Sequence, residues 1–153
     1  MKKIVSLVMA FAMWLMGCST SGNPLGQSCK VLVYENGQSS QMHPQNDEEL
    51  EALVKELVSG TDDAYKQIVT SQDIEELRQQ HCVEIMFQDE LTIPIDNSER
   101  TLTLSKILMP LDQGEGDGVV MYCGRKTYFS PPYFNSHGAR LLDRIMQYVT
   151  IMP

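Results

Sequence analysis

The sequence predicts an α+β fold, a single small domain in which a mainly antiparallel sheet of about four to six strands carries about three helices packed mostly on one face. Two observations support this prediction. Apolar residues have helical spacing over much of residues 46–80, whereas alternation and β-branched residues dominate from Cys82 onward. The candidate strands are therefore clustered. Residues 29–153 show no internal repeat and no second domain.

The first predicted strand is KVLVYENG, residues 30–37, where a short apolar and β-branched run ends at Asn36-Gly37. The residues that follow are polar. Residues 46–60 then predict a helix, which Asn46 or Asp47 can cap and which Gly60 follows. The apolar side chains of this helix share one face: Leu50, Leu53, Val54 and Leu57.

Two shorter helical segments are expected next. Weak helical spacing runs from Thr61 to Val69, and Ser71 can cap a further helix over residues 72–80. Acidic residues near the start of that last segment suit the helix dipole. The helices before Cys82 therefore form a crossover between the first strand and the later ones, and we expect the two strands flanking it to pair in parallel.

Strands dominate the second half of the chain. Residues 82–87 alternate, and residues 91–95 and 100–104 resemble the arms of a hairpin. Further strands are expected at residues 106–111, 119–124 and 126–130, with the glycine-rich loop DQGEGDG at residues 112–118. Pro131-Pro132 is expected to end the sheet. A last helix should begin at Asn135 or Ser136, with an apolar stripe along it.

The N-terminus is a targeting segment in this interpretation. Lys2 and Lys3 precede an apolar run over residues 4–16, which is shorter than the ~20 residues a spanning helix needs. The run ends in Leu15-Met16-Gly17-Cys18, which resembles the lipobox of bacterial lipoprotein precursors, with Met16 larger than the usual residue. The resemblance covers only about the first twenty residues.

That resemblance implies a defined maturation. Residues 1–17 would be a cleaved signal peptide, and a diacylglycerol would be attached to the Cys18 sulfur. Residues 18–28, rich in Ser and Gly, would form a flexible tether to the domain at residues 29–153. The expected location is therefore extracytoplasmic, anchored by lipid to a bacterial plasma membrane or outer membrane. No other stretch of the sequence is long and apolar enough to span a bilayer.

The charge of the chain restricts its partners. It carries 12 basic and 20 acidic residues, and losing Lys2 and Lys3 leaves ten against 20, a net charge of −10. A surface this acidic repels phosphate backbones, so nucleic acid is excluded as a partner. The expected partners are the membrane, through the N-terminal lipid, and a protein or small-molecule ligand.

The cysteines left after Cys18 are odd in number: Cys29, Cys82 and Cys123. Disulfides can form outside the cytoplasm. If the strands that follow Cys29 and Cys82 are parallel neighbours, both thiols lie at the same end of the sheet. A Cys29–Cys82 disulfide is therefore the first candidate. Cys123 is an alternative partner for either, and three unpaired thiols remain possible.

No catalytic or cofactor motif is present. The sequence contains no GxSxG, HExxH, P-loop, redox CxxC or dinucleotide fingerprint. A Cys82 or Cys123 nucleophile served by His137 is conceivable, but nothing in the spacing supports it. DQGEGDG does not place acidic or amide ligands where a calcium loop needs them. No catalytic residue, metal or cofactor is therefore assigned.

Aromatic residues concentrate in YFSPPYF, residues 128–134. Tyr128, Phe129, Tyr133 and Phe134 could form an exposed recognition surface or could cover one end of the core. The function that fits best is a non-catalytic, lipid-anchored binding or interaction module. Two alternatives stay open: a Cys-dependent hydrolase or thiol-active enzyme at the cell envelope, and a structural lipoprotein of envelope assembly.

Overall fold

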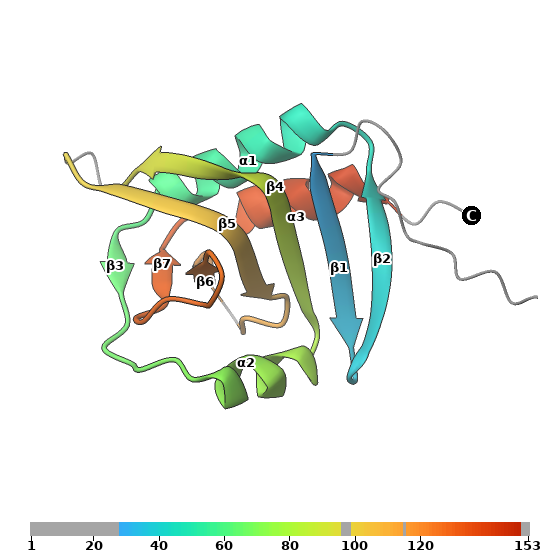
Figure 1. Ribbon diagram of the computed structural model, residues 1–153, viewed down its shortest axis with the longest axis horizontal. Coiled ribbons are helices and arrows are strands. Elements are labelled where there is room, and N and C mark those ends of the chain that lie inside the picture. Colours follow the sequence, from blue (N-terminus) through green and yellow to red (C-terminus); the bar gives the residue numbers. More distant parts are fainter. Residues whose placement is uncertain (1–27, 96–98, 115, 151–153) are drawn as a thin grey trace, which may run out of the picture.

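The computed structural model describes residues 28–95, 99–114 and 116–150, so the expected signal peptide and nearly all of the tether lie outside it. The described chain is one antiparallel sheet with helices on both faces (Figure 1). The α+β class is confirmed, although the eight strands exceed the expected number. The elements are β1 (Cys29–Glu35), β2 (Gln38–Pro44), α1 (Asp47–Ser59), β3 (Asp63–Ala64), α2 (Ser71–Arg78), β4 (Cys82–Pro94), β5 (Thr101–Pro110), β6 (Val119–Gly124), β7 (Tyr133–Asn135), α3 (Ala139–Tyr148) and β8 (Val149–Thr150).

The sheet begins with a hairpin that the sequence interpretation missed. Asn36 and Gly37 have positive φ angles of 51° and 78°, as a two-residue type I′ turn requires. The chain therefore returns as β2, a polar strand that pairs antiparallel with β1. Along the sheet the strand order is β3-β7-β6-β5-β4-β1-β2-β8.

The expected parallel pairing across the helical crossover is wrong. β1 pairs with β4 antiparallel, with Cys29 opposite Phe87 and Tyr34 opposite Cys82. The physical reason is the hairpin turn, because the crossover departs from the end of β2 and not from the end of β1. β4 can therefore lie antiparallel to β1 on the side that β2 leaves free.

The central strands are longer than expected. β4 runs through both segments that had been predicted separately at residues 82–87 and 91–95, with a register shift between Met86 and Leu91. β5 likewise joins the segments at 100–104 and 106–111 into one strand. The proline in each sits at the last residue of its strand, Pro94 and Pro110, where a missing N–H is tolerated.

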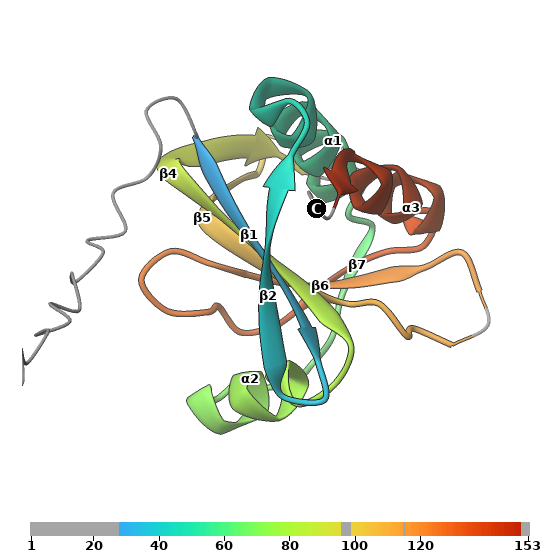
Figure 2. The same ribbon diagram turned by 90° about the vertical axis from the view of Figure 1, so that its right-hand side faces the viewer.

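Helices cover both faces of the sheet, as Figure 2 shows. α1 and α3 pack together on one face over the main core, which includes Val31, Leu57, Ile85, Ile107 and Ile145. α2 lies on the opposite face over a smaller apolar cluster of Ile74, Cys82 and Leu108. The expectation that helices lie mostly on one face holds for α1 and α3 and fails for α2.

The helix ends follow their capping residues. Asn46 caps α1 by accepting from the backbone N–H groups of Glu48 and Glu49, as expected. Thr70, not Ser71, caps α2, in a reciprocal capping box with Asp73. The expected helix between Thr61 and Val69 does not form, because this segment holds β3 and irregular backbone.

The last part of the chain differs from the sequence-based prediction in two places. Residues 126–130 form no strand beyond a single bridge between Gly124 and Tyr128, and the sheet resumes after the prolines as β7. α3 begins at Ala139, later than expected. Among the described helices, none combines the length and apolarity needed to cross a membrane.

Candidate functional site

A buried carboxylate lies at the centre of the sheet face under α2. Glu84 projects from β4, between Leu32 of β1 and Leu108 of β5 in the strand register. Its side chain is only 2 % exposed. Burying an unpaired carboxylate is very costly, so the surrounding residues must satisfy its oxygens.

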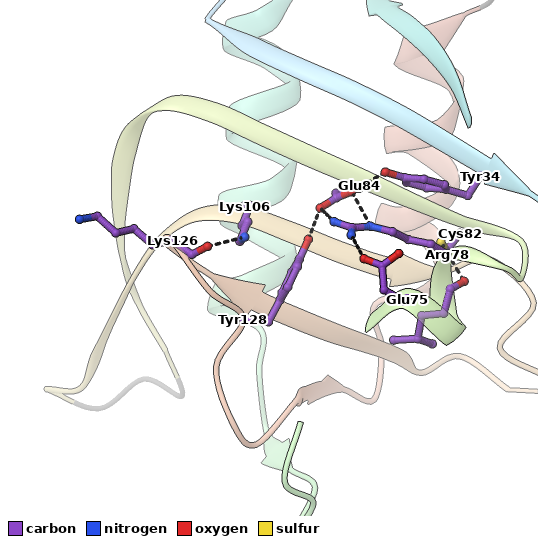
Figure 3. Close-up of polar contacts among 9 residues, drawn as sticks. Tyr34, Glu75, Arg78, Cys82, Glu84, Lys106, Lys126 and Tyr128 are labelled. Carbon is purple, nitrogen blue, oxygen red and sulfur yellow. Dashed lines mark hydrogen bonds and ion pairs between the residues drawn. The ribbon is translucent and has the colours of Figure 1, made fainter. Parts of the chain in front are cut away.

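Three side chains from separate elements hold the Glu84 carboxylate, as Figure 3 shows. Arg78 of α2 donates from Nη2 to Oε1 over 2.7 Å and from Nε to Oε2 over 3.2 Å. The hydroxyl of Tyr34 in β1 donates to Oε2 over 2.8 Å, and the hydroxyl of Tyr128 donates to Oε1. We call these four residues the Glu84 cluster.

The Glu84 cluster keeps the carboxylate ionised. Burial alone would raise the pKa of Glu84, but hydrogen bonds from Arg78, Tyr128 and Tyr34 outweigh it and leave the pKa below its ordinary value. Burial and the nearby carboxylate raise the pKa of Tyr34 to about 12 and raise the pKa of Tyr128 further. Both hydroxyls are therefore protonated donors across the physiological range.

An open pocket of about 440 Å³ lies beside the Glu84 cluster, between α2, β5 and the loop after β6. That volume is within the range of small-molecule sites. Its walls combine basic, hydroxyl and apolar side chains. The lining residues are Val69, Thr70, Ser71, Ile74, Glu75, Arg78, Lys106, Lys126, Thr127 and Tyr128.

Lys106 of β5 occupies the pocket wall opposite α2. Its ammonium lies 4.5 Å from the centre of the Tyr128 ring, a cation–π distance, and donates to the Lys126 carbonyl oxygen over 2.9 Å. Partial burial lowers the pKa of Lys106, the nearby Glu84 carboxylate opposes this effect, and the Arg78 charge adds to it. The ammonium is thus held in a fixed place by a ring and a carbonyl, and among the described residues no carboxylate forms an ion pair with it.

A tight turn places Tyr128 and Lys126 at the pocket. Arg125 N–H donates to the Thr127 carbonyl, and Phe129 N–H donates to the Cys123 carbonyl, so the chain folds back on β6 immediately after Gly124. A Cβ atom at Gly124 would lie 2.4 Å from the Thr127 carbonyl oxygen. Glycine is therefore required at this position for the turn to close.

The three cysteines of the domain are not brought together. Cys29 and Cys82 lie at opposite ends of the β1–β4 pairing, five residues apart along the strand, or roughly 17 Å at ~3.4 Å per residue. Cys123 lies on the main-core face, whereas Cys82 faces α2. All three are buried free thiols. The expectation that Cys29 and Cys82 lie at the same end of the sheet, close enough for a disulfide, is therefore wrong.

Burial also makes these thiols poor nucleophiles. It raises the pKa of Cys29 to about 12, of Cys82 to about 11 and of Cys123 to about 12, with nearby carboxylates adding to the effect at Cys29 and Cys82. The reactive form of cysteine is the thiolate. Cys82 instead donates its S–H to the Leu77 carbonyl at the end of α2.

We therefore expect iodoacetamide at pH 8 to leave all three thiols unmodified in the folded mature protein and to modify all three in urea without reductant. Peptide mass spectrometry measures each site separately, which keeps Cys18 out of the comparison. Rapid modification of any one thiol in the folded protein would contradict its burial. A pair that resists modification in urea until reductant is added would show a disulfide.

The four aromatic residues of the expected recognition surface are distributed over different places. Tyr128 belongs to the Glu84 cluster, whereas Phe129 and Tyr133 pack against the main core. The Phe134 ring contacts the Tyr65 ring edge to face, with centroids 5.7 Å apart. Of the four, only Tyr128 lines the pocket.

The histidines do not complete a nucleophilic site. His81 Nδ1 lies 3.3 Å from a carboxylate oxygen of Asp112 at the surface. His137 is exposed, and its backbone N–H donates to Asn135. Within the described part of the chain, no three His, Cys, Asp or Glu side chains are grouped as metal ligands.

Comparisons with protein-family models, with curated proteins and with solved structures find no match to this chain.

The sequence interpretation missed the Glu84 cluster and the pocket. In an alternating strand, Glu84 is indistinguishable from a solvent-facing residue. A signal was nevertheless present, because Leu108 and Tyr122 place apolar side chains on that same face of the neighbouring strands. A face with apolar residues on successive strands must be covered, which makes a carboxylate there a buried one.

Proposed function

We propose that this protein is a lipid-anchored extracytoplasmic binding module, non-catalytic, whose ligand occupies the pocket between α2, β5 and the loop after β6. The observation that carries the proposal is the pocket itself, open and backed by the fully hydrogen-bonded Glu84 cluster. The anchor is supported by the N-terminal sequence alone.

The pocket wall is preorganised. Arg78 of α2 and Tyr128 of the loop after β6 line the pocket, and both are held by the same buried carboxylate, which Tyr34 of β1 also contacts. Arg78 is fixed further by Glu75, which accepts from Nη1 over 2.6 Å. A wall already ordered before binding loses little conformational entropy on binding, which favours affinity for a small ligand.

The N-terminal tether would set how far the domain can stand from the membrane. The chain enters the described domain at Ser28, whose side chain hydrogen-bonds Asp47 at the start of α1. A ten-residue tether spans roughly 30 Å when extended, at ~3.3 Å per residue. Tethered at Cys18, the domain and its pocket would be held close to the bilayer surface.

A thiol enzyme is not favoured by the site. The three cysteines of the domain are buried with raised pKa values, and among the described residues none of them lines the pocket. Glu84 is also unsuited to proton transfer, because its oxygens accept hydrogen bonds from three side chains and its pKa is lowered. The pocket is suited to holding a molecule, and Arg78 and Tyr128 in its wall are engaged in hydrogen bonds to Glu84.

The pocket is tested by amide NMR of the mature chain, residues 18–153 with Cys18→Ser to keep it soluble, titrated with a fragment mixture. We expect the largest shift changes at Ile74, Thr127 and Tyr128. The groove between α1 and α3, lined by Glu49 and Arg144, is the internal control. Shift changes confined to that groove, or none at all, would contradict the proposed site.

A further inference from the structure

We propose that the pocket binds a small organic anion, with its carboxylate or phosphate group at the Lys106 ammonium and a compact apolar body against Ile74 and the Tyr128 ring. The proposal rests on the function proposed above and specifies the chemical class of its ligand. Three observations support it: the charge of the lining, the surroundings of Lys106, and the apolar wall.

The pocket is basic in a chain that is acidic overall. Arg78, Lys106 and Lys126 line it against a single carboxylate, Glu75, whereas the chain has a net charge of −8. Arg78 is committed to Glu84 and Glu75. Neither lysine forms an ion pair with a carboxylate among residues 28–95, 99–114 and 116–150. The uncompensated charge of the pocket is therefore positive.

Lys106 has the capacity to hold an anion. An ammonium offers three donors, and the structure assigns one of them to the Lys126 carbonyl. The ring of Tyr128 and the carbonyl fix the position of the group without neutralising it. Because Lys106 is half-buried, an anion placed there interacts with it at a lower effective dielectric than at an open surface.

The start of α2 forms another part of the lining, through Thr70 and Ser71. It adds no net positive charge, because the Asp73 carboxylate lies in the first turn and offsets the positive end of the helix dipole. The capping box is also closed, since Asp73 N–H donates to Thr70 Oγ1 and the Asp73 carboxylate accepts from the N–H and the hydroxyl of Thr70. The anion site is therefore placed at Lys106. The remaining wall is apolar, formed by Val69 and Ile74. A ligand with an anionic group at one end and a small ring at the other fits this division.

The test uses four compounds that share a phenyl ring and differ in charge: phenyl phosphate, benzoate, benzamide and benzylamine. Each is titrated into the mature Cys18→Ser chain, with amide shifts at Ile74, Thr127 and Tyr128 as the readout. We expect both anions to bind at least five-fold more tightly than benzamide, and benzylamine to bind weakest. The order of the two anions distinguishes a phosphate ester from a carboxylate ligand, and either order supports the proposal.

Lys106→Gln is the decisive variant, because glutamine can still donate to the Lys126 carbonyl while the charge is removed. We expect it to weaken benzoate binding about ten-fold and to leave benzamide binding within two-fold. Lys55→Gln is the matched control, since Lys55 pairs with Glu51 on the exposed side of α1. It should change neither affinity. Urea denaturation of both variants verifies that they fold.

The outcomes separate the two proposals. Benzamide or benzylamine binding in the pocket as tightly as the anions would overturn the anion assignment and leave the pocket as a binding site. Unchanged benzoate affinity in folded Lys106→Gln would also overturn it. Shift changes at no pocket residue with any of the four compounds would contradict the proposed function as well.

Discussion

We expect Glu84→Gln to lower the free energy of unfolding by about 3 kcal/mol. The substitution keeps the shape of the side chain and removes the negative charge to which Arg78 and two tyrosine hydroxyls donate hydrogen bonds. Removing one partner of a buried ion pair leaves the other charge uncompensated, which costs about 3–5 kcal/mol. The lower end applies here because the Arg78 side chain is 25 % exposed and keeps Glu75 as a second partner.

The pH dependence of this effect has a defined sign. The folded-state pKa of Glu84 lies below its ordinary value of 4.5, because hydrogen bonds from Arg78, Tyr128 and Tyr34 outweigh the effect of burial. The stability it contributes is therefore fully present above the unfolded-state pKa and is lost as the pH falls through the folded-state pKa. The difference between the native protein and Glu84→Gln should be largest at neutral pH and shrink below about pH 4.

Urea denaturation followed by circular dichroism, repeated between pH 7 and pH 3, measures both effects. The matched control is Glu90→Gln, which removes a carboxylate from an ion pair with Arg125 whose side chains are 46 % and 52 % exposed. An exposed pair contributes only about 0–1 kcal/mol. A Glu84→Gln variant no less stable than Glu90→Gln would contradict the view that the Glu84 cluster holds α2 on the sheet.

The sequence correctly predicted the elements that are specified by their own residues. α1 is bounded by Asn46 and Gly60 as predicted, and β6 occupies the predicted residues 119–124. β2 was missed because its residues are mostly polar, as an edge strand with exposed side chains permits. The Asn36-Gly37 turn was the available evidence for it. Without that hairpin, β1 and β4 were expected to be parallel, and the cysteine geometry derived from this was wrong.

The candidate site could not be predicted because it depends on which element covers which face. Lys106 and Glu84 are ordinary polar residues of alternating strands in the sequence. They become a site only because α2 crosses to the face opposite α1 and α3 and brings Arg78 with it. Helical periodicity identifies the apolar side of α2, marked by Ile74, but does not say which face of the sheet that side meets.

The prediction with the largest expected effect in the cell concerns the anchor. In a bacterial host, Cys18→Ser should abolish incorporation of labelled palmitate and remove the mature form from the membrane fraction. The reason is that the thiol of Cys18 is the proposed attachment atom for diacylglycerol. Each buried CH₂ contributes about 0.8 kcal/mol, and two acyl chains suffice for stable anchoring.

Fractionation, palmitate labelling and mass spectrometry of the N-terminal peptide measure the result. Ser21→Ala, in the same expected tether, is the matched control and should remain labelled and membrane-bound. Cys18→Ser that is still labelled and cleaved after Gly17 would contradict the lipobox interpretation. The pocket is independent of that outcome, because Glu84, Lys106 and their partners all lie within the described domain. A Cys18→Ser protein that loses the membrane anchor and still binds ligand in the pocket would therefore show that anchoring and ligand binding are independent.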